Sequence, residues 1–339
     1  MIYGGWKSIA VLVFGFFLCI YVWRKSDKCY EGPVRSVFPC QCDDNLERGT
    51  DSDPLLLKLP PEDRHRLIDL LDFDYVIQQK SCSELNLRPL ALIVIHSGPQ
   101  NEQKRNLIRR TWGRDKRSRL IFLLGTVSST YLQASIESEN MNHGDILQGN
   151  FIDAFHNLTY KHAMAFKWSA YFCPEAKYIL KTDDDVFVNT PVLLDHLEKD
   201  LSTINISPKK LVGCYKVIGY PIVRDTHLQW RVSPELFEGD YFPPFCLGFT
   251  ILYSPDSVAL LYREIQRTHY FWIDDVHITG TLTHKARISV NAFNSLFLTR
   301  NQFKDIIKGK LNSKFTLFFF TYYNITEFEI EELWQKLMK

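Results

Sequence analysis

The sequence has almost no excess charge of either sign, and this narrows what the protein can bind. Its 40 Lys and Arg residues are balanced by 39 Asp and Glu residues, which gives a formal net charge of +1. Binding to nucleic acid needs clustered positive charge, so the composition argues against a nucleic-acid partner. The chain also lacks internal repeats, a Gly-x-Gly-x-x-Gly fingerprint and a Walker A loop. These absences argue against a repeat protein, a dinucleotide-binding motif and a P-loop.

Cysteine is scarce, and its spacing is not that of a metal site. No Cys-x2-Cys pair occurs twice among the 8 cysteines, which argues against zinc. Cys19 lies in an apolar N-terminal run, which leaves seven others: Cys29, Cys40, Cys42, Cys82, Cys173, Cys214 and Cys246. In an oxidising compartment some would pair, and the odd number leaves one free or bound to another chain. Cys214 and Cys246 fit a structural disulfide better than a role in a site.

Long apolar runs are also rare, and the main one is at the N-terminus. Residues 8–23 carry no charge and lie between Lys7 and a basic stretch at 24–28. As a helix this run would rise about 24 Å, slightly less than the ~30 Å hydrocarbon core of a bilayer, and apolar residues before Lys7 extend it. A cleaved signal peptide is the alternative, but no small-x-small cleavage site follows. We expect a cytoplasmic tail (1–7) and a signal anchor (8–23).

Three glycosylation sequons favour a lumenal position for the rest of the chain. They are Asn157-Leu-Thr159, Asn205-Ile-Ser207 and Asn324-Ile-Thr326, and Pro208 weakens the second. Charge alone does not choose the orientation, because basic residues flank the apolar run on both sides.

The remaining chain divides into a stem and one large domain. Residues 24–85 are rich in Pro and polar residues and are predicted to be a stem. Within it, "PEDRHRLIDLLDF" (61–73) could form one short helix. From residue 86 to 339, apolar strands alternate with helices, which indicates a parallel sheet covered on both faces. The aromatic segment "KFTLFFFTYY" (314–323) is predicted to be a buried strand.

The predicted strands and helices of the domain are easily read from the sequence. Strands are expected at "PLALIVIHS" (89–97), "RLIFLLGT" (119–126) and the run before Asp183, and helices at "NEQKRNLIRRTWG" (101–113), "ASIESENMNHGD" (134–145) and "NLTYKHAMAFKWSAYFC" (157–173).

Three consecutive carboxylates follow one of these buried strands. Asp183, Asp184 and Asp185 come after "YIL" and before "VFV". Burying like charges is costly unless something cationic offsets them. Carboxylates at the carboxyl end of a strand suit Mg2+ or Mn2+ with substrate phosphates completing the shell. A phosphatase with an Asp nucleophile is one interpretation, although Phe187 replaces its usual Thr or Val. A nucleotide-sugar transferase is the other.

Six motifs, found in the same order along the chain, support a nucleotide-sugar transferase. Through them, residues from about 90 to 280 resemble the β1,3-glycosyltransferase family, which includes β1,3-galactosyl- and β1,3-N-acetylglucosaminyltransferases. The motifs are "KRNLIRRTWG" (104–113), "FLLG" (122–125), "GDILQGNFIDAFHNLTYK" (144–161), "KTDDDVFVN" (181–189), "FPPFCLGFTILYS" (242–254) and "IDDVHITG" (273–280).

The resemblance implies a GT-A fold, a UDP-sugar donor, Mn2+ and a Golgi type II membrane topology. It implies that Asp185 is the main metal ligand, that Asp183 lies near the metal or ribose with Asp184 beside it, and that Asp275 is the catalytic base. Donor-site residues implied by the family are Arg105, Arg109 and Lys161 around the nucleotide and Trp230 and Phe245 flanking the sugar or acceptor.

Plainer structural explanations compete for several of these residues. Asp274 and Asp275 follow the apolar run "YFWI", where burial could raise the pKa of Asp275, but a solvated strand end or a helix cap is equally expected. Lys161 on its own is better explained as an exposed helix residue. Arg109 could be a surface charge, and Trp230 could be part of the core.

The sequence also departs from the family pattern. Asn150 replaces the usual Asp, and Thr250 and Ile251 replace the usual Gly-Tyr. Tyr323 aligns with a C-terminal His that would be a second metal ligand, which puts the metal dependence in doubt. His277 and His284 could substitute for it.

Taken together, these observations predict a Golgi enzyme that transfers galactose or N-acetylglucosamine from UDP to the 3-hydroxyl of a glycan acceptor on a glycoprotein or glycolipid. The altered position at Tyr323 keeps an alternative open, in which a catalytically inactive relative binds glycans or acts as a chaperone. The intact Asp triplet and Asp275 favour the enzyme.

Overall fold

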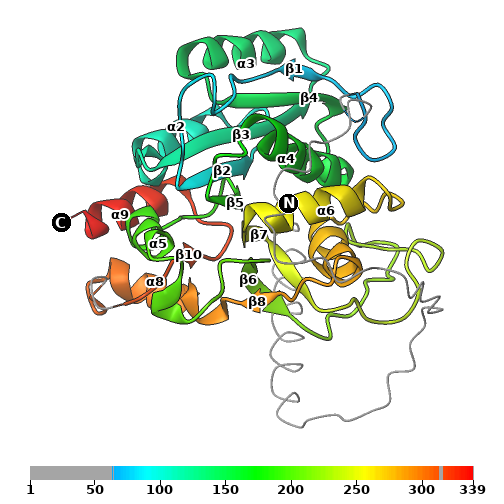
Figure 1. The fold of residues 1–339 in the computed structure, drawn as a ribbon. Helices are drawn as coiled ribbons and strands as arrows, with labels where there is room; N and C mark the ends of the chain where they lie inside the picture. The colour runs from blue at the N-terminus through cyan, green and yellow to red at the C-terminus, as the bar shows by residue number, and fades with distance from the viewer. Residues whose placement is uncertain (1–62, 64, 313–315, 339) are drawn as a thin grey trace, which may run out of the picture. The chain divides into compact units, whose positions relative to one another are not determined.

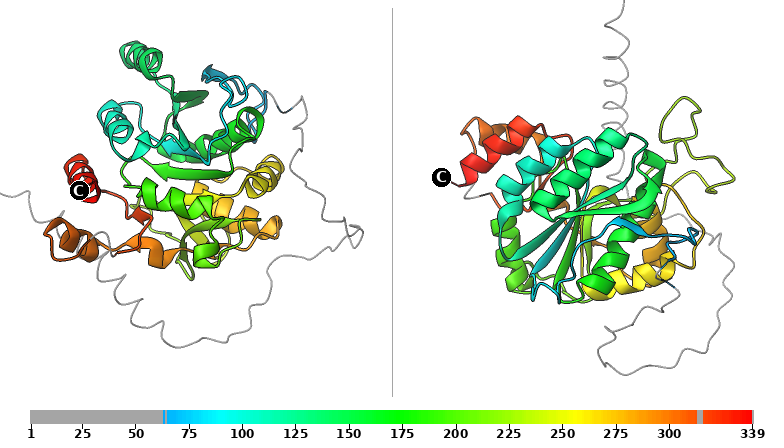
Figure 2. Two further views of the ribbon diagram at one scale, coloured as in Figure 1. Left: turned by 60° about the vertical axis from the view of Figure 1, so that its left-hand side comes forward. Right: turned by 90° about the horizontal axis from the view of Figure 1, so that it is seen from above.

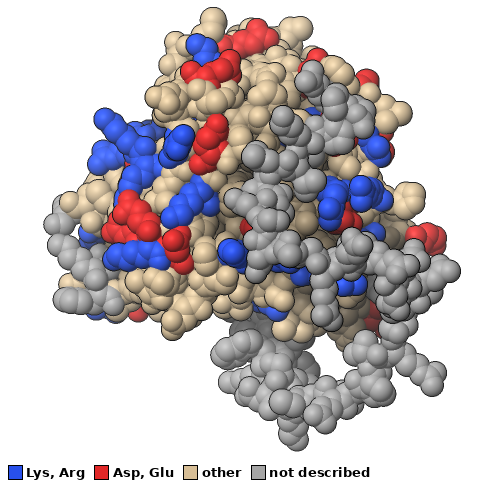
Figure 3. Space-filling model, in the orientation of Figure 1, with Lys and Arg blue, Asp and Glu red and all other residues tan. Residues whose placement is uncertain are grey.

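The computed structural model describes residues 63, 65–312 and 316–338. The predicted tail, the anchor at 8–23 and most of the stem lie outside the described residues. Within the described ranges, no helix is long and apolar enough to cross a membrane. On the face shown in Figure 3, groups of Lys and Arg lie next to groups of Asp and Glu.

An eight-stranded mixed sheet forms the centre of the domain (Figure 1). Its strands, in spatial order, are β1 (Tyr75–Ile77), β4 (Ile146–Ile152), β3 (Ser118–Thr126), β2 (Ala91–His96), β5 (Tyr178–Asp183), β7 (Phe245–Tyr253), β6 (Val212–Val217) and β8 (Asn291–Ala292). β4, β3, β2 and β5 are parallel, whereas β7 runs antiparallel to β5 and to β6. The predicted parallel sheet is therefore confirmed for its central strands.

Helices cover both faces of this sheet (Figure 2). Successive side chains of a strand point to opposite faces, so Ile93 and Ile95 of β2 belong to one core cluster, and Leu92 and Val94 to the other. The first core includes residues of α2 (Glu102–Arg110), α3 (Thr130–His143), α5 (Thr190–Glu198), α8 (Arg300–Ile307) and α9 (Glu327–Leu337). The second includes α4 (Leu158–Phe172), α6 (Pro255–Ile265) and the π-helix η5 (Val276–Leu282), which runs into the short α7 (Thr283–Lys285).

The C-terminal aromatic segment is buried but is only briefly a strand. β10 (Phe320–Thr321) pairs with β9 (Phe297–Leu298), and Phe320 also bridges to Val188. Phe318 and Phe319 are buried without strand pairing of their own. The predicted strand over 314–323, of which 314 and 315 lie outside the described residues, is therefore confirmed only at Phe320–Thr321. The bridge from Phe320 to Val188 brings the C-terminal segment beside the residues that follow the Asp triplet.

The short helix predicted over 61–73 is wrong in the described part of that range. Leu67 and Leu70 instead pair with each other across a tight turn, in which Ile68 has a φ of 59°. Tertiary contacts outweigh helix propensity here, because the buried Lys167 ammonium donates to the carbonyl oxygen of Arg66 and its charge lies 4.7 Å from the Phe73 ring centre.

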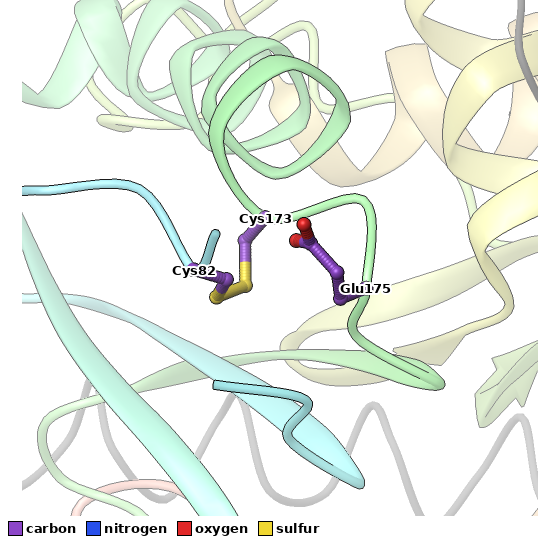
Figure 4. Close-up of side chains that lie close together, drawn as sticks. All are labelled: Cys82, Cys173 and Glu175. Carbon is purple, nitrogen blue, oxygen red and sulfur yellow. A yellow bond between two sulfur atoms is a disulfide. The ribbon is translucent and has the colours of Figure 1, made fainter. Parts of the chain in front are cut away.

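Part of the range assigned to the stem packs against the domain. β1 forms the edge of the sheet by pairing with β4, and Cys82 forms a disulfide with Cys173 after α4 (Figure 4). Glu175 lies beside this disulfide. The sulfur atoms of Cys82 and Cys173 are bonded to each other and are therefore not available to a metal. A second disulfide joins Cys214 to Cys246, as the sequence predicted.

Candidate active site

The site is built around the carboxyl end of β5, where the Asp triplet begins. β5 ends at Asp183 and pairs in parallel with β2, so His96 at the end of β2 lies opposite Asp183. The loop after β2 and the triplet after β5 therefore emerge at the same edge of the sheet. β7, antiparallel to β5, brings Gly248 to that edge as well.

Asp184 holds the loop between β2 and α2 in place. Its Oδ2 accepts hydrogen bonds from the Ser97 hydroxyl at 2.7 Å, the Asn101 amide at 2.9 Å and the Gly98 N–H at 3.4 Å. Its Oδ1 accepts from the Lys104 ammonium at 3.2 Å. Both oxygens are thus engaged by protein donors, so Asp184 shapes the site rather than offering a free ligand.

Asp183 pairs with a lysine of its own strand. The Lys181 ammonium lies 2.8 Å from Asp183 Oδ1 and donates to the Gly248 carbonyl at 2.6 Å. Burial, opposed by Lys181 and reinforced by the charge of Asp185, raises the pKa of Asp183 to about 6. The Asp183 side chain is still 34% exposed, so a ligand can reach it.

Asp185 is fixed by the C-terminal segment. Its Oδ2 accepts a hydrogen bond from the Asn324 N–H at 3.1 Å, and its carbonyl accepts from the Ile325 N–H at 3.1 Å. Burial raises the pKa of Asp185, which indicates a carboxylate whose charge is not fully balanced. Tyr323 precedes this contact, is 49% exposed and packs 5.3 Å from the Phe249 ring. Tyr323 thus lies one residue before the backbone donor that holds Asp185.

Asp275 lies at the start of η5 and is anchored by two backbone donors. Its Oδ1 accepts from the Val276 N–H at 2.7 Å and its Oδ2 from the Gly248 N–H at 3.0 Å. A Cβ atom at position 248 would lie only 3.0 Å from the Asp275 Cβ, so the close contact between this strand and Asp275 favours a glycine at 248. Burial, followed by the charge of Asp274, raises the pKa of Asp275 to about 7. The helix-cap explanation of Asp275 is correct, and the expected rise in its pKa is also confirmed.

Lys181 supplies part of the positive charge that the acidic cluster requires. Besides Asp183, its charge stabilises Asp274 and Asp275. Burial alone would lower the pKa of Lys181, but these carboxylates outweigh burial and raise it. The sequence analysis assigned the offsetting charge to Mg2+ or Mn2+ and missed Lys181, although a lysine inside the apolar strand "YILKTD" was the available signal.

The predicted nucleotide-side cations are bound by acidic residues of the protein. Arg105 is fully buried, lies 2.6 Å from Glu139 and donates to the Ser97 hydroxyl at 3.1 Å, which links it to Asp184. Arg109 pairs with Glu139 and Asp145, farther along the same helix face. Glu139 therefore joins the two arginines.

Lys161 is buried, so its interpretation as an exposed helix residue is wrong. Its ammonium donates to Asp153 at 2.8 Å and to the Ser97 carbonyl at 3.0 Å. Asp153 in turn accepts from the Gly125 N–H at 2.7 Å. These contacts bring Lys161 to the same loop as Asp184 and Arg105.

Aromatic residues form a second part of the site region. Trp230 is 50% exposed, so its interpretation as a core residue is wrong. Its ring lies 4.6 Å from Phe155 and stacks at 6.0 Å with Trp272, just before Asp274. Phe245 is buried instead, packed against neighbouring aromatic rings. Phe155 and Trp272 were missed, because nothing local in the sequence predicts their approach to Trp230.

The residues that depart from the family pattern have structural roles. Asn150 donates to the Asp72 carbonyl at 2.7 Å and so ties the segment before β1 to β4. The Thr250 hydroxyl lies 3.0 Å from the Thr182 hydroxyl inside the sheet, and Ile251 is fully buried. These substitutions fit packing rather than chemistry.

Neither histidine suggested as a substitute metal ligand joins the triplet in a metal-binding cluster. His277 is buried, and burial lowers its pKa to about 4, whereas His284 is exposed. Among the described residues, the clusters of three potential ligands include neither of them.

Comparisons with known proteins agree with the motifs. The family model described as Galactosyltransferase matches residues 103–294. β-1,3-Galactosyltransferase 5 of Pan troglodytes is 33% identical over 212 residues, which cover 61% of this chain and 69% of that protein. β-1,3-Galactosyltransferase 1 of Mus musculus is 32% identical over 220 residues, which cover 63% of this chain and 66% of that protein.

Solved structures show weaker likenesses. The apo structure of the bifunctional glycosyltransferase WbbM has a TM-score of 0.37 at 12% identity, covering 75% of this chain and 47% of that chain. Galactosyltransferase LgtC in complex with donor and acceptor sugar analogs has a TM-score of 0.33 at 10% identity, covering 69% of this chain and 87% of that chain. Scores this low carry no argument about the present chain.

Proposed function

The chain belongs to the galactosyltransferase family and is thus a hexosyltransferase, and on that basis we propose that it is an inverting β1,3-glycosyltransferase of the GT-A fold. It moves galactose, or N-acetylglucosamine, from a UDP-sugar to the 3-hydroxyl of a glycan acceptor. The observation that supports this best is the arrangement around Lys181. One buried cation pairs with Asp183 and also stabilises the charges of Asp274 and Asp275, which indicates that a candidate base lies near carboxylates that would face a diphosphate.

Asp275 is suited to act as the base of such a transfer. The acceptor hydroxyl oxygen forms a bond to the anomeric carbon of the donor while the bond from that carbon to the diphosphate oxygen breaks, which inverts the anomeric centre. Asp275 takes the hydroxyl proton. Because its pKa is raised to about 7, Asp275 is partly ionised at neutral pH and is basic enough to accept a proton. The two backbone N–H donors fix its orientation.

The triplet fits a divalent cation on the leaving-group side. Asp183 and Asp185 both have raised pKa values because burial is not fully offset, and a cation would correct this imbalance. Asp183 uses Oδ1 for Lys181 and keeps Oδ2 for a ligand. We propose that these two residues hold Mn2+, which when bound would neutralise charge on the departing UDP. Asp184, saturated by protein donors, is assigned to positioning the β2–α2 loop.

The remaining site residues receive supporting roles in this proposal. Lys161 and Arg105 stiffen the loop that would face the nucleotide, through Ser97. Arg109 belongs to the same ion-pair network through Glu139. Trp230, half-exposed and backed by two aromatic rings, offers an apolar face to the donor sugar or the acceptor.

A Golgi location is part of the proposal and rests on the sequence. The uncharged run at 8–23 would anchor the chain as a single-pass type II membrane protein with its domain in the lumen. Two disulfides within the described residues suit an oxidising lumen.

A donor screen tests the proposed activity. The full chain in detergent is incubated with Mn2+ and UDP-galactose, UDP-N-acetylglucosamine or UDP-N-acetylgalactosamine, and the release of UDP is measured with and without a glycan acceptor. Acceptor-dependent release with one of the first two donors supports the proposal. The absence of release with every donor, together with retained glycan binding, supports the alternative of an inactive, glycan-binding relative.

A further inference from the structure

A buried polar cluster lies beside Asp274. It is formed by His162 of α4, Tyr253 of β7 and His96 at the end of β2. The His162 side chain is 0% exposed, and its Nδ1 lies 2.9 Å from Asp274 Oδ2. Its Nε2 lies 3.3 Å from the Tyr253 hydroxyl. His162 thus links the carboxylate beside Asp275 to Tyr253 of the sheet, and the family motifs did not include it.

The partners of His162 determine which nitrogen carries the proton. The ionised Asp274 carboxylate can only accept, so Nδ1 must donate to it. Burial raises the pKa of Tyr253 well above its ordinary value, so its hydroxyl is protonated and can donate to Nε2. Burial lowers the pKa of His162 despite the carboxylate beside it, so the ring is neutral. The hydrogen bonds therefore run in one direction, from Tyr253 through His162 to Asp274.

A metal ion is a less suitable explanation of the same cluster. The ligand atoms of His96, His162 and Asp274 do lie within 4.8 Å of one another. However, the charge of the buried Lys181 acts on all three of them, and a second cation placed among them would be repelled. Asp274 also already accepts the proton of His162, which a metal would have to displace.

We propose that His162 is a positioning residue for the catalytic carboxylate pair: its Nδ1–H holds the Asp274 carboxylate in place, and Asp274 in turn sets the environment of Asp275. This inference rests on the proposed function. It follows from geometry, because Asp274 and Asp275 are adjacent at the start of η5 and their carboxylates face different partners, His162 for the first and the Gly248 N–H for the second.

The electrostatics of the pair agree with this role. Burial alone would raise the pKa of Asp274, but Lys181 and the hydrogen bond from His162 outweigh burial and lower it. The charge thus kept on Asp274 is the second cause, after burial, of the raised pKa of Asp275. Without the His162 donor, Lys181 would be the main group that stabilises the charge of Asp274. The pKa values of both Asp274 and Asp275 would then change.

Two nearly isosteric substitutions at His162 separate positioning from packing. His162→Asn keeps an N–H donor near the place of Nδ1, whereas His162→Leu has a similar shape and no donor. Hydrogen bonds to charged groups make the expected loss in kcat of His162→Leu roughly 10- to 100-fold. We expect His162→Asn to recover most of this loss and Tyr253→Phe to stay close to the parent, because it leaves the bond from Nδ1 to Asp274 intact. UDP affinity, measured by calorimetry, should be unchanged in all three variants.

Equal kcat in His162→Asn and His162→Leu, or a loss of UDP affinity that accounts for the change in rate, would overturn the inference. A second measurement does not depend on activity or on variants that fold. In the full chain labelled with 15N-histidine, NMR should show His162 neutral and protonated at Nδ1, and finding the proton at Nε2 would also overturn it. If the parent transfers no sugar, the proposed function fails, and the tautomer still decides whether His162 donates to Asp274.

Discussion

Replacing Asp275 with Asn is the perturbation that most directly tests the base. The side chain keeps its size, but it can no longer accept the proton of the acceptor hydroxyl. General-base catalysis is typically worth about 10²- to 10⁴-fold in rate, or roughly 3–5 kcal/mol. We therefore expect kcat to fall by that order while UDP affinity is retained, because Asp275 contacts Gly248 and Val276 rather than the triplet.

The structure also predicts how the same substitution changes stability. Asp275 accepts two backbone N–H groups, whereas Asn has one acceptor oxygen, so one of the two donors would face an amide NH2. A buried donor left unpaired costs about 1–3 kcal/mol. In the opposite direction, Asn removes the repulsion between the charges of Asp274 and Asp275. Because the folded-state pKa of Asp275 is raised to about 7, its ionisation lowers parental stability as pH rises from the unfolded-state pKa to the folded-state pKa.

These two effects can be separated by measuring thermal unfolding at several pH values. The free energy of unfolding of Asp275→Asn, relative to the parent, should increase from about pH 4 to about pH 7, because the ionisation of Asp275 destabilises only the parent in that window. The folded-state pKa of Asp274 is instead lowered, so the direct contribution of Asp274 to stability changes only below its unfolded-state pKa, outside this window. A variant that keeps near-parental turnover, or loses UDP affinity, would show that Asp275 is not the base, and Asp274 would be the next candidate.

Three further predictions concern the metal side, the pH profile and glycosylation. Asp185→Ala should abolish transfer and weaken Mn2+ and UDP binding together in calorimetry while the fold, measured by circular dichroism, survives; comparable turnover in variant and parent would rule out a metal role. The rate at low substrate concentration should fall as pH drops below about 7, because Asp275 must lose its proton to act; a rate independent of pH between 5.5 and 8 would contradict this. An endoglycosidase should shift the gel mobility of the membrane-bound chain, with Asn324 more accessible than Asn157, whose amide donates to the Ile152 carbonyl; no shift, with the domain open to protease in intact vesicles, would place the domain in the cytosol.

The central elements could be predicted from the sequence because their signals are local. The apolar run that ends at His96 and the run that ends at Asp183 are long enough to be read as buried strands, and both are. The basic segment after the first strand forms α2 as expected. The parallel order then requires the polar residues after both strands to meet at one edge, which the contact of Ser97 with Asp184 confirms.

What could not be predicted depends on contacts between distant parts of the chain. Lys161 looks like a solvated helix residue until α4 packs over the sheet and Asp153 receives its charge. His162, one residue later, faces Asp274, 112 positions away. The helix expected over 61–73 does not form for the same reason, because Leu67 and Leu70 pack into the core and pair with each other across a turn instead of forming one face of a helix.

The way in which Asp185 is held limits which substitutions can be used to study the rim of the site. The partner atom is the backbone N–H of Asn324, not its side chain, so the side chain at 324 can change without loss of that bond. Asn324 has a φ of 59°, a left-handed conformation that glycine adopts freely and most residues do not. The substitution of Asn by Gln that is commonly used to remove a glycosylation site would strain this turn. Thr326→Ala, which also removes the site, would remove the capping box that starts α9. Asn324→Gly instead deletes the glycan acceptor and leaves both the turn and the donor to Asp185 unchanged.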